Sequence, residues 1–181
     1  SSAGVRAELT ASALDGIDTG YAIRRFRRMV TALEPDHVLV MLGLNDAQPA
    51  GGRSKSSPDE FRQNLCSLVE RILEIDAVPS LITPNPRFDC KLRDPEDLMP
   101  PYVEMMIDVA EDYLIDCIDV HGRFRGIESL SELIPDGVHP APGGHRIIAE
   151  AIAEHLIPQL RNAEFASPAD PPGGDGSALS N

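Results

Sequence analysis

Asp136 and His139 lie three residues apart in residues 135–140, which read PDGVHP. A turn that is bounded by prolines and contains glycine lets the carboxylate fold back and accept a hydrogen bond from the imidazole. A carboxylate in that position fixes the imidazole tautomer, so that the second ring nitrogen can take a proton from a hydroxyl nucleophile. The spacing is typical of the orienting pair of a catalytic triad. The alternative is a surface turn with a solvated histidine.

Asn45 and Gly16 are the other residues whose types suit acyl-transfer chemistry. Asn45 follows a continuous apolar run at 37–42, and its uncharged amide can donate N–H to a developing oxyanion. Gly16 lies in an Asp-Gly turn, where the lack of a side chain lets a substrate approach the backbone N–H closely. Each residue is also compatible with ordinary turn chemistry when it is considered alone.

Strands and helices are expected to alternate along the chain and to position these loops. Apolar periodicity, helix caps and Gly/Pro breaks predict strands at 5–12, 37–42, 78–83 and 114–120, and helices at 20–33, 57–75, 101–113 and 142–160. This order favours an α/β fold with a mostly parallel sheet that is covered by helices on both faces. Ligands bind beyond the carboxyl ends of the strands in such sheets, so Gly16, Asn45 and the 135–140 turn should meet there.

Three segments resemble sequence blocks of the SGNH (GDSL-type) hydrolases. Residues 38–46, VLVMLGLND, are similar to the third block and match its oxyanion asparagine with Asn45. Residues 136–140, DGVHP, resemble the fifth block with its Asp-x-x-His pair, and residues 13–19 resemble the second block, whose oxyanion glycine Gly16 would match. The resemblance spans about residues 5–160. It implies a flavodoxin-like three-layer α/β/α fold and ester hydrolysis through an acyl-enzyme, without a cofactor.

The first block of that family, a strand running into Gly-Asp-Ser with the nucleophile, has no match in this chain. We therefore expect the first strand and the catalytic serine to be missing, so that these 181 residues alone are an inactive fragment. One alternative is a circularly permuted enzyme that uses Ser177 in the Gly-Asp-Gly-Ser stretch of the tail. Another is a catalytically inactive SGNH-like module that binds an ester or glycan.

Composition narrows the range of partners. The formal net charge of −13 disfavours nucleic acid and anionic membrane surfaces, and no run approaches the roughly 20 apolar residues of a membrane span. A soluble protein is expected, but its localisation and oligomeric state cannot be inferred. Three substrate classes remain open: small-molecule esters, lipid esters and acetylated glycans.

The remaining inferences concern metals, thiols and domain limits. The histidines show no metal-binding cluster, and the odd number and wide spacing of the cysteines imply neither a disulfide framework nor a zinc site. The three cysteines, Cys66, Cys90 and Cys117, are expected to be buried free thiols. A single domain is predicted at 1–162, followed by a disordered Pro/Gly/Ser-rich tail at 163–181.

Overall fold

The computed structural model describes residues 7–50, 53–92 and 96–166. Helices and strands alternate along most of this length. The strands are β1 (His37–Val40), β2 (Pro49–Ala50), β3 (Arg53–Ser54), β4 (Val78–Ile82) and β5 (Asp116–Ile118). The helices are α1 (Thr19–Met29), the 3₁₀ turn η1 (Thr31–Leu33), α2 (Pro58–Leu73), α3 (Pro100–Tyr113), α4 (Val120–Arg123), α5 (Leu130–Leu133) and α6 (Pro142–Ala166).

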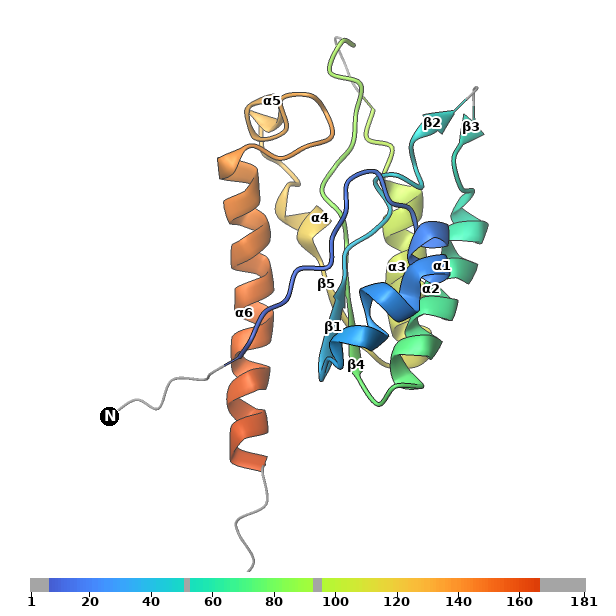
Figure 1. Cartoon of the computed structure of the whole chain (residues 1–181). Helices are drawn as coiled ribbons and strands as arrows, with labels where there is room; N and C mark the ends of the chain where they lie inside the picture. The colour runs from blue at the N-terminus through green and yellow to red at the C-terminus, as the bar shows by residue number, and fades with distance from the viewer. Residues whose placement is uncertain (1–6, 51–52, 93–95, 167–181) are drawn as a thin grey trace, which may run out of the picture.

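The main sheet is parallel and has the strand order β1-β4-β5. His37 pairs with Val78 at one end of the first ladder, and Ser80 pairs with Asp116 in the second. Figure 1 shows α1, α2 and α3 on one side of this sheet and α6 on the other. The expected three-layer α/β/α arrangement with a parallel sheet is confirmed. A small antiparallel hairpin, β2-β3, lies between β1 and α2 in the sequence.

A separate apolar cluster fills the space on each face of the sheet. On the α1–α3 face, Phe61, Leu65 and Met106 are fully buried. On the α6 face, Ile82 and Ile118 from the sheet belong to one cluster with residues of α6 and the segments before it. Burial of both sheet faces explains why the strands are continuous apolar runs rather than alternating ones.

Local sequence signals account for α2 well. Ser57 accepts a hydrogen bond from the Glu60 amide at 3.2 Å, and Pro58 occupies the first helical turn, where its missing N–H leaves no partner unsatisfied. The apolar residues that recur at helical spacing are all buried: Phe61, Leu65, Leu68, Val69 and Ile72. Both the predicted start and the predicted buried face of this helix are confirmed.

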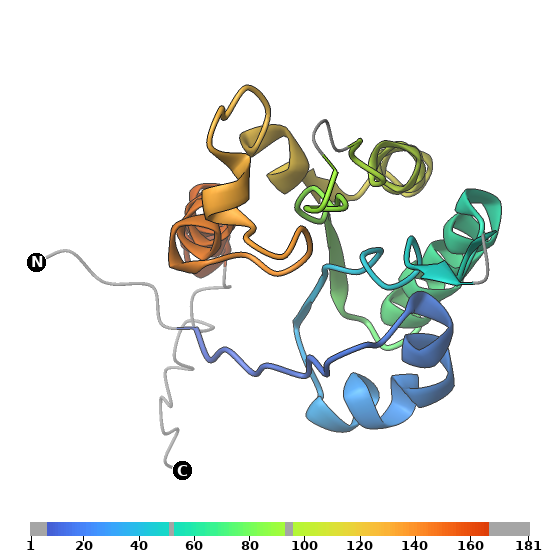
Figure 2. The ribbon, with the colours of Figure 1, turned by 90° about the horizontal axis from the view of Figure 1, so that it is seen from above.

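The predicted strand at 5–12 is wrong over the part that the structure describes. Residues 7–12 are irregular, and the Leu9 side chain is 87% exposed. Figure 2 shows this segment running in an extended path from the side of α6 toward α1. A strand requires a hydrogen-bonded neighbour, and within residues 7–50, 53–92 and 96–166 no strand pairs with the outer edge of β1.

Two further expectations need correction. α6 continues to Ala166, so the helix crosses the boundary predicted at 162; the rest of the predicted tail, including Ser177, lies outside the described residues. Cys66 and Cys117 are half-buried free thiols, but Cys90, in the loop after β4, is exposed. No helix in the described ranges is long and apolar enough to cross a bilayer.

Candidate active site

Two loops that follow strands and one turn between helices lie at one end of the molecule. The segments after β1 and β4 and the turn before α6 all extend toward the upper end in Figure 1. This is the carboxyl end of the parallel strands, where loop side chains and free backbone groups gather. The predicted site residues Asn45, Asp136 and His139 belong to two of these loops.

The Asp136–His139 contact that was expected from the spacing is present. His139 Nδ1 lies 2.7 Å from Asp136 Oδ2, while Asp136 Oδ1 accepts the backbone N–H groups of Val138 at 2.9 Å and His139 at 2.7 Å. Gly137 permits this turn because its φ is +76° and a Cβ there would lie 2.0 Å from the Phe88 carbonyl oxygen. The imidazole is 81% exposed, so a reacting group can approach it from solvent.

Asp136 is held as a carboxylate by these donors. The His139 amide, the His139 imidazole and the Val138 amide together hold the pKa of Asp136 well below its ordinary value of 3.8. The contribution of this carboxylate to folding stability is therefore present above pH 3.8 and is lost only as the pH falls toward the lowered pKa.

The carboxyl carbon of Asp136 is expected to keep its ionised NMR position as the pH falls through 3.8. In His139→Ala one of the three donors is gone, so the titration midpoint should move up toward the ordinary value. A ¹³C titration of the labelled chain and of this variant measures both. A wild-type midpoint at or above 3.8 would contradict the hydrogen-bonded geometry.

The structure brings Asn45 to the loop that contains Gly16. Asn45 Nδ2 donates to the Ile17 carbonyl oxygen at 2.9 Å, so the side-chain amide lies beside the residue that follows Gly16. Gly16 has a φ of +74°, and no heavy atom lies within 4 Å of the position that a Cβ would occupy. The Asn45 side chain is thus bonded to the loop that contains Gly16, with open space at the glycine.

The buried carboxylate of Asp46 links the loop after β1 to the start of α1. The sequence pattern did not indicate this contact. Asp46 is fully buried and accepts the Thr19 hydroxyl at 2.5 Å and the Thr19 amide at 3.2 Å. Burial raises the pKa of Asp46, and the hydrogen bonds from Thr19 oppose that effect. Asn64 donates to the same hydroxyl at 3.0 Å. The contact spans 27 residues, and no local pattern indicates it.

The loop after β4 joins the Asn45 loop to the Asp136–His139 turn. Asn85 is 1% exposed and donates from Nδ2 to the Val138 carbonyl oxygen at 3.1 Å. The Phe88 amide donates to the Gly137 carbonyl oxygen at 2.9 Å, and Arg87 Nη1 donates to the Leu44 carbonyl oxygen at 2.8 Å. The Asn-Pro pair after a buried strand was the available signal for a functional loop here.

The chain matches a known protein family over most of its length. The model of the GDSL-like lipase/acylhydrolase family matches residues 3–147. The chain belongs to this family. The resemblance inferred from the Asn45 and Asp136–His139 segments is confirmed.

Curated relatives of this GDSL-family chain are esterases. It is 25% identical over 150 residues to the human isoamyl acetate-hydrolyzing esterase 1 homolog, covering 74% of this chain and 59% of the relative. It is 27% identical over 143 residues to an acetylxylan esterase of Xylanibacter ruminicola, covering 67% of this chain and 28% of the relative. The chain therefore spans less than two thirds of the length of these relatives.

Solved structures share the fold. An alpha/beta hydrolase from the metagenome of Lake Arreo, Spain, aligns with a TM-score of 0.64 at 27% identity, over 77% of this chain and 67% of the other. An acetylxylan esterase from Geobacillus stearothermophilus aligns with a TM-score of 0.65 at 26% identity, over the same shares.

A second carboxylate–imidazole pair in this GDSL-family chain lies deeper in the same region. His121 Nε2 is 2.6 Å from Asp97 Oδ2, and Asp97 Oδ1 also accepts the amides of Met99 at 2.9 Å and Arg87 at 3.1 Å. Burial opposes ionisation of Asp97, but these hydrogen bonds outweigh it and lower its pKa. His121 is buried, so this pair braces the loop after β4 rather than facing solvent.

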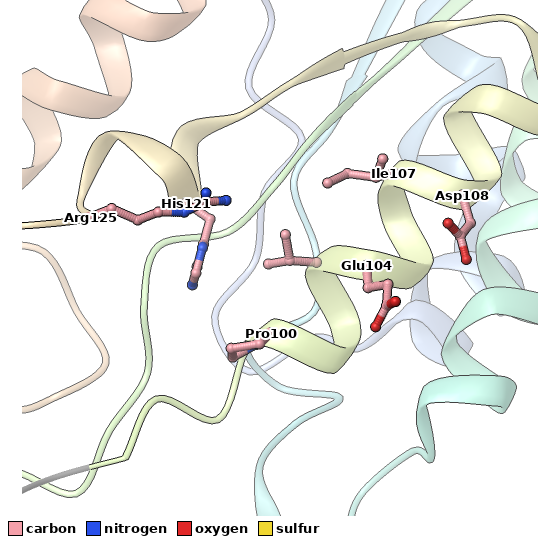
Figure 3. A pocket seen from close by; sticks show the side chains of 7 residues that line it. Pro100, Glu104, Ile107, Asp108, His121 and Arg125 are labelled. Carbon is pink, nitrogen blue, oxygen red and sulfur yellow. The ribbon is translucent and has the colours of Figure 1, made fainter.

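The cavity next to His121 is separate from the predicted site residues. Figure 3 shows His121 and Arg125 on one side of it and residues of α3 on the other. The volume of the cavity is about 330 Å³. None of Gly16, Asn45, Asp136 and His139 lines this cavity. The candidate site is therefore formed by the loops and not by this cavity.

Proposed function

We propose that this chain supplies the relay and oxyanion parts of a serine ester hydrolase that acts through an acyl-enzyme. The single observation that carries the proposal is the exposed His139 imidazole, held at 2.7 Å by a carboxylate that is itself fixed by two backbone amides. A solvated turn histidine would need no such restraint on its orientation. Membership of the acylhydrolase family supports the same chemistry.

Each group has a defined role in the proposed reaction. A serine hydroxyl attacks the acyl carbon while His139 takes its proton, and the protonated imidazole then gives that proton to the leaving alcohol. Water enters the acyl-enzyme by the same route in the second half of the reaction. Asp136 orients the imidazole and stabilises its charged form throughout.

Gly16 and Asn45 are proposed to bind the tetrahedral oxyanion. A side-chain amide has two N–H donors, and Asn45 gives one of them to Ile17. The other remains for the substrate oxygen, and the Ile17 contact fixes the direction in which it points. The Gly16 N–H would be the second donor, in a turn where no side chain blocks the approach.

The nucleophile is not assigned to a residue. In the part of the chain that the structure describes, no serine hydroxyl is hydrogen-bonded to His139. Catalytic variants of the Geobacillus acetylxylan esterase have a serine or an aspartate replaced by alanine, which supports a serine nucleophile and an aspartate in this fold.

Acetate esters are the proposed substrate class. The two curated relatives are named for acetate esters of different alcohols, one a small branched alcohol and the other an acetylated glycan. The acetyl group is their shared element, so we propose a site that accepts a short acyl group. Among the alternatives left open by the sequence, acetylated glycans have the support of two acetylxylan esterases.

The proposal is tested with the protein at its full natural length. We expect turnover of p-nitrophenyl acetate, and covalent labelling of one serine by a fluorophosphonate probe, located by peptide mass spectrometry. Labelling of Ser177 would assign the nucleophile to the tail. If the protein binds acetylated xylo-oligosaccharides but shows neither turnover nor labelling, the hydrolase proposal is wrong and the chain is a binding module.

A further inference from the structure

Arg87 lies between the two halves of the candidate site. We propose that it is a positioning residue, which holds the Asn45 loop at a fixed distance from the Asp136–His139 turn. This inference rests on the proposed function and adds a residue to it. Arg87 is neither one of the proposed proton-transfer residues, Asp136 and His139, nor a proposed oxyanion donor. It would act by positioning the loops that carry those residues.

The side chain of Arg87 forms the contact with the oxyanion side. Its guanidinium donates from Nη1 to the carbonyl oxygen of Leu44 at 2.8 Å, one residue before Asn45. Leu44 follows Gly43, whose φ of +120° turns the chain away from the strand direction. A donor at the Leu44 carbonyl therefore fixes the backbone from which the Asn45 side chain projects.

Two residues close to Arg87 in the sequence form the contacts with the Asp136–His139 turn. Phe88 donates its amide to Gly137 O at 2.9 Å, and Asn85 donates its side-chain amide to Val138 O at 3.1 Å. Both acceptors lie between Asp136 and His139 in the sequence. The segment 85–88 is thus bonded directly to the turn that orients the imidazole.

Arg87 is itself held on both sides of its backbone. Its amide donates to Asp97 at 3.1 Å, and its carbonyl accepts the Leu98 amide at 2.8 Å. Asp97 is in turn fixed by His121 at 2.6 Å. Because the Arg87 backbone is restrained at both its amide and its carbonyl, its side chain can hold the Leu44 carbonyl in a fixed position.

Charge and burial also favour a specific role for this guanidinium. Arg87 is half-buried, and burial lowers its pKa while the nearby Asp136 carboxylate opposes that effect. Taking a cation partly out of water has a cost, and a merely space-filling side chain would avoid it. The guanidinium keeps several N–H donors in one plane, so it can donate to the Leu44 carbonyl while it interacts with the charge of the Asp136 carboxylate.

The test compares Arg87→Ala and Arg87→Lys with Arg71→Ala in the full-length protein. Arg71 is the matched control, because its Nη1 also donates to a backbone carbonyl, that of Ile23 at 2.9 Å, but it lies on α2 away from the site. For Arg87→Ala we expect kcat for p-nitrophenyl acetate to fall about 10-fold to 100-fold with little change in KM. Added guanidinium, at concentrations that leave the fold intact, should restore part of kcat in this variant only.

The outcomes separate this inference from the proposed function. An active wild-type protein whose kcat is unchanged in Arg87→Ala, or equally reduced in Arg71→Ala, would overturn the role of Arg87 and leave the hydrolase proposal standing. A lysine variant that is more active than the alanine variant supports positioning by a cationic donor. If Arg87→Ala unfolds, Arg87→Lys takes its place in the comparison. The lysine variant is expected to keep the fold and to lose part of kcat.

A readout without activity covers the case of an inactive wild-type protein. In ¹⁵N-labelled protein, Arg87→Ala should shift the side-chain amide signals of Asn45 and the backbone amide of His139 together. Arg71→Ala should shift neither. If Arg87→Ala leaves either signal in place, the two loops are not joined through Arg87 and the inference is wrong.

Discussion

Replacing His139 with alanine is expected to lower kcat for p-nitrophenyl acetate by about 10⁴-fold or more in the full-length protein. The variant retains binding and oxyanion contacts but has no group to accept the serine proton. The side chain is 81% exposed, so its removal should change thermal stability little. Stopped assays of hydrolysis and a thermal melt measure the two effects.

His145→Ala is the matched control for this prediction. His145 is an exposed histidine near the start of α6, six residues from His139 and outside the relay turn. Its variant should hydrolyse the ester at the wild-type rate. Substantial activity in His139→Ala would mean that another base serves the reaction, and the catalytic assignment of the Asp136–His139 pair would fail.

Replacing Asn45 with alanine is expected to reduce kcat by about 10²-fold to 10³-fold while KM changes much less. The reason is that the proposed N–H donor interacts with charge that develops only in the transition state. The contact with the Ile17 carbonyl is lost as well, so the Gly16 turn should also become less restrained. Steady-state kinetics with p-nitrophenyl acetate separate kcat from KM.

Gln48→Ala provides the comparison for Asn45. Gln48 is an exposed side-chain amide three residues further along the same loop. Its replacement should leave both kinetic constants unchanged. A rise in KM at constant kcat in Asn45→Ala would instead indicate a ground-state contact with substrate, and the oxyanion role would then have to be given up.

Local sequence determined the features whose partners lie within a few residues. Ser57, Pro58 and Glu60 form a complete helix start, and the structure has α2 beginning there. The Asp136–His139 contact likewise depends on a turn of four residues, and its geometry was predictable from spacing alone.

The strand expected at 5–12 shows where local reasoning fails. Its loose alternation of apolar and polar residues is compatible with a strand, but a strand forms only beside another one. The pairing partner is a property of the fold and not of the segment. The Leu9 side chain in this segment is 87% exposed.

Tertiary structure alone decided which distant residues complete the site. Arg87 reaches Leu44 across 43 positions, and Asn85 reaches Val138 across 53. The sequence by itself determined the family, the alternating elements and the residue types suited to acyl transfer. It could not determine these pairings, because contacts between loops depend on how parallel strands bring their carboxyl ends to one edge and on which side chains are then close enough to bond.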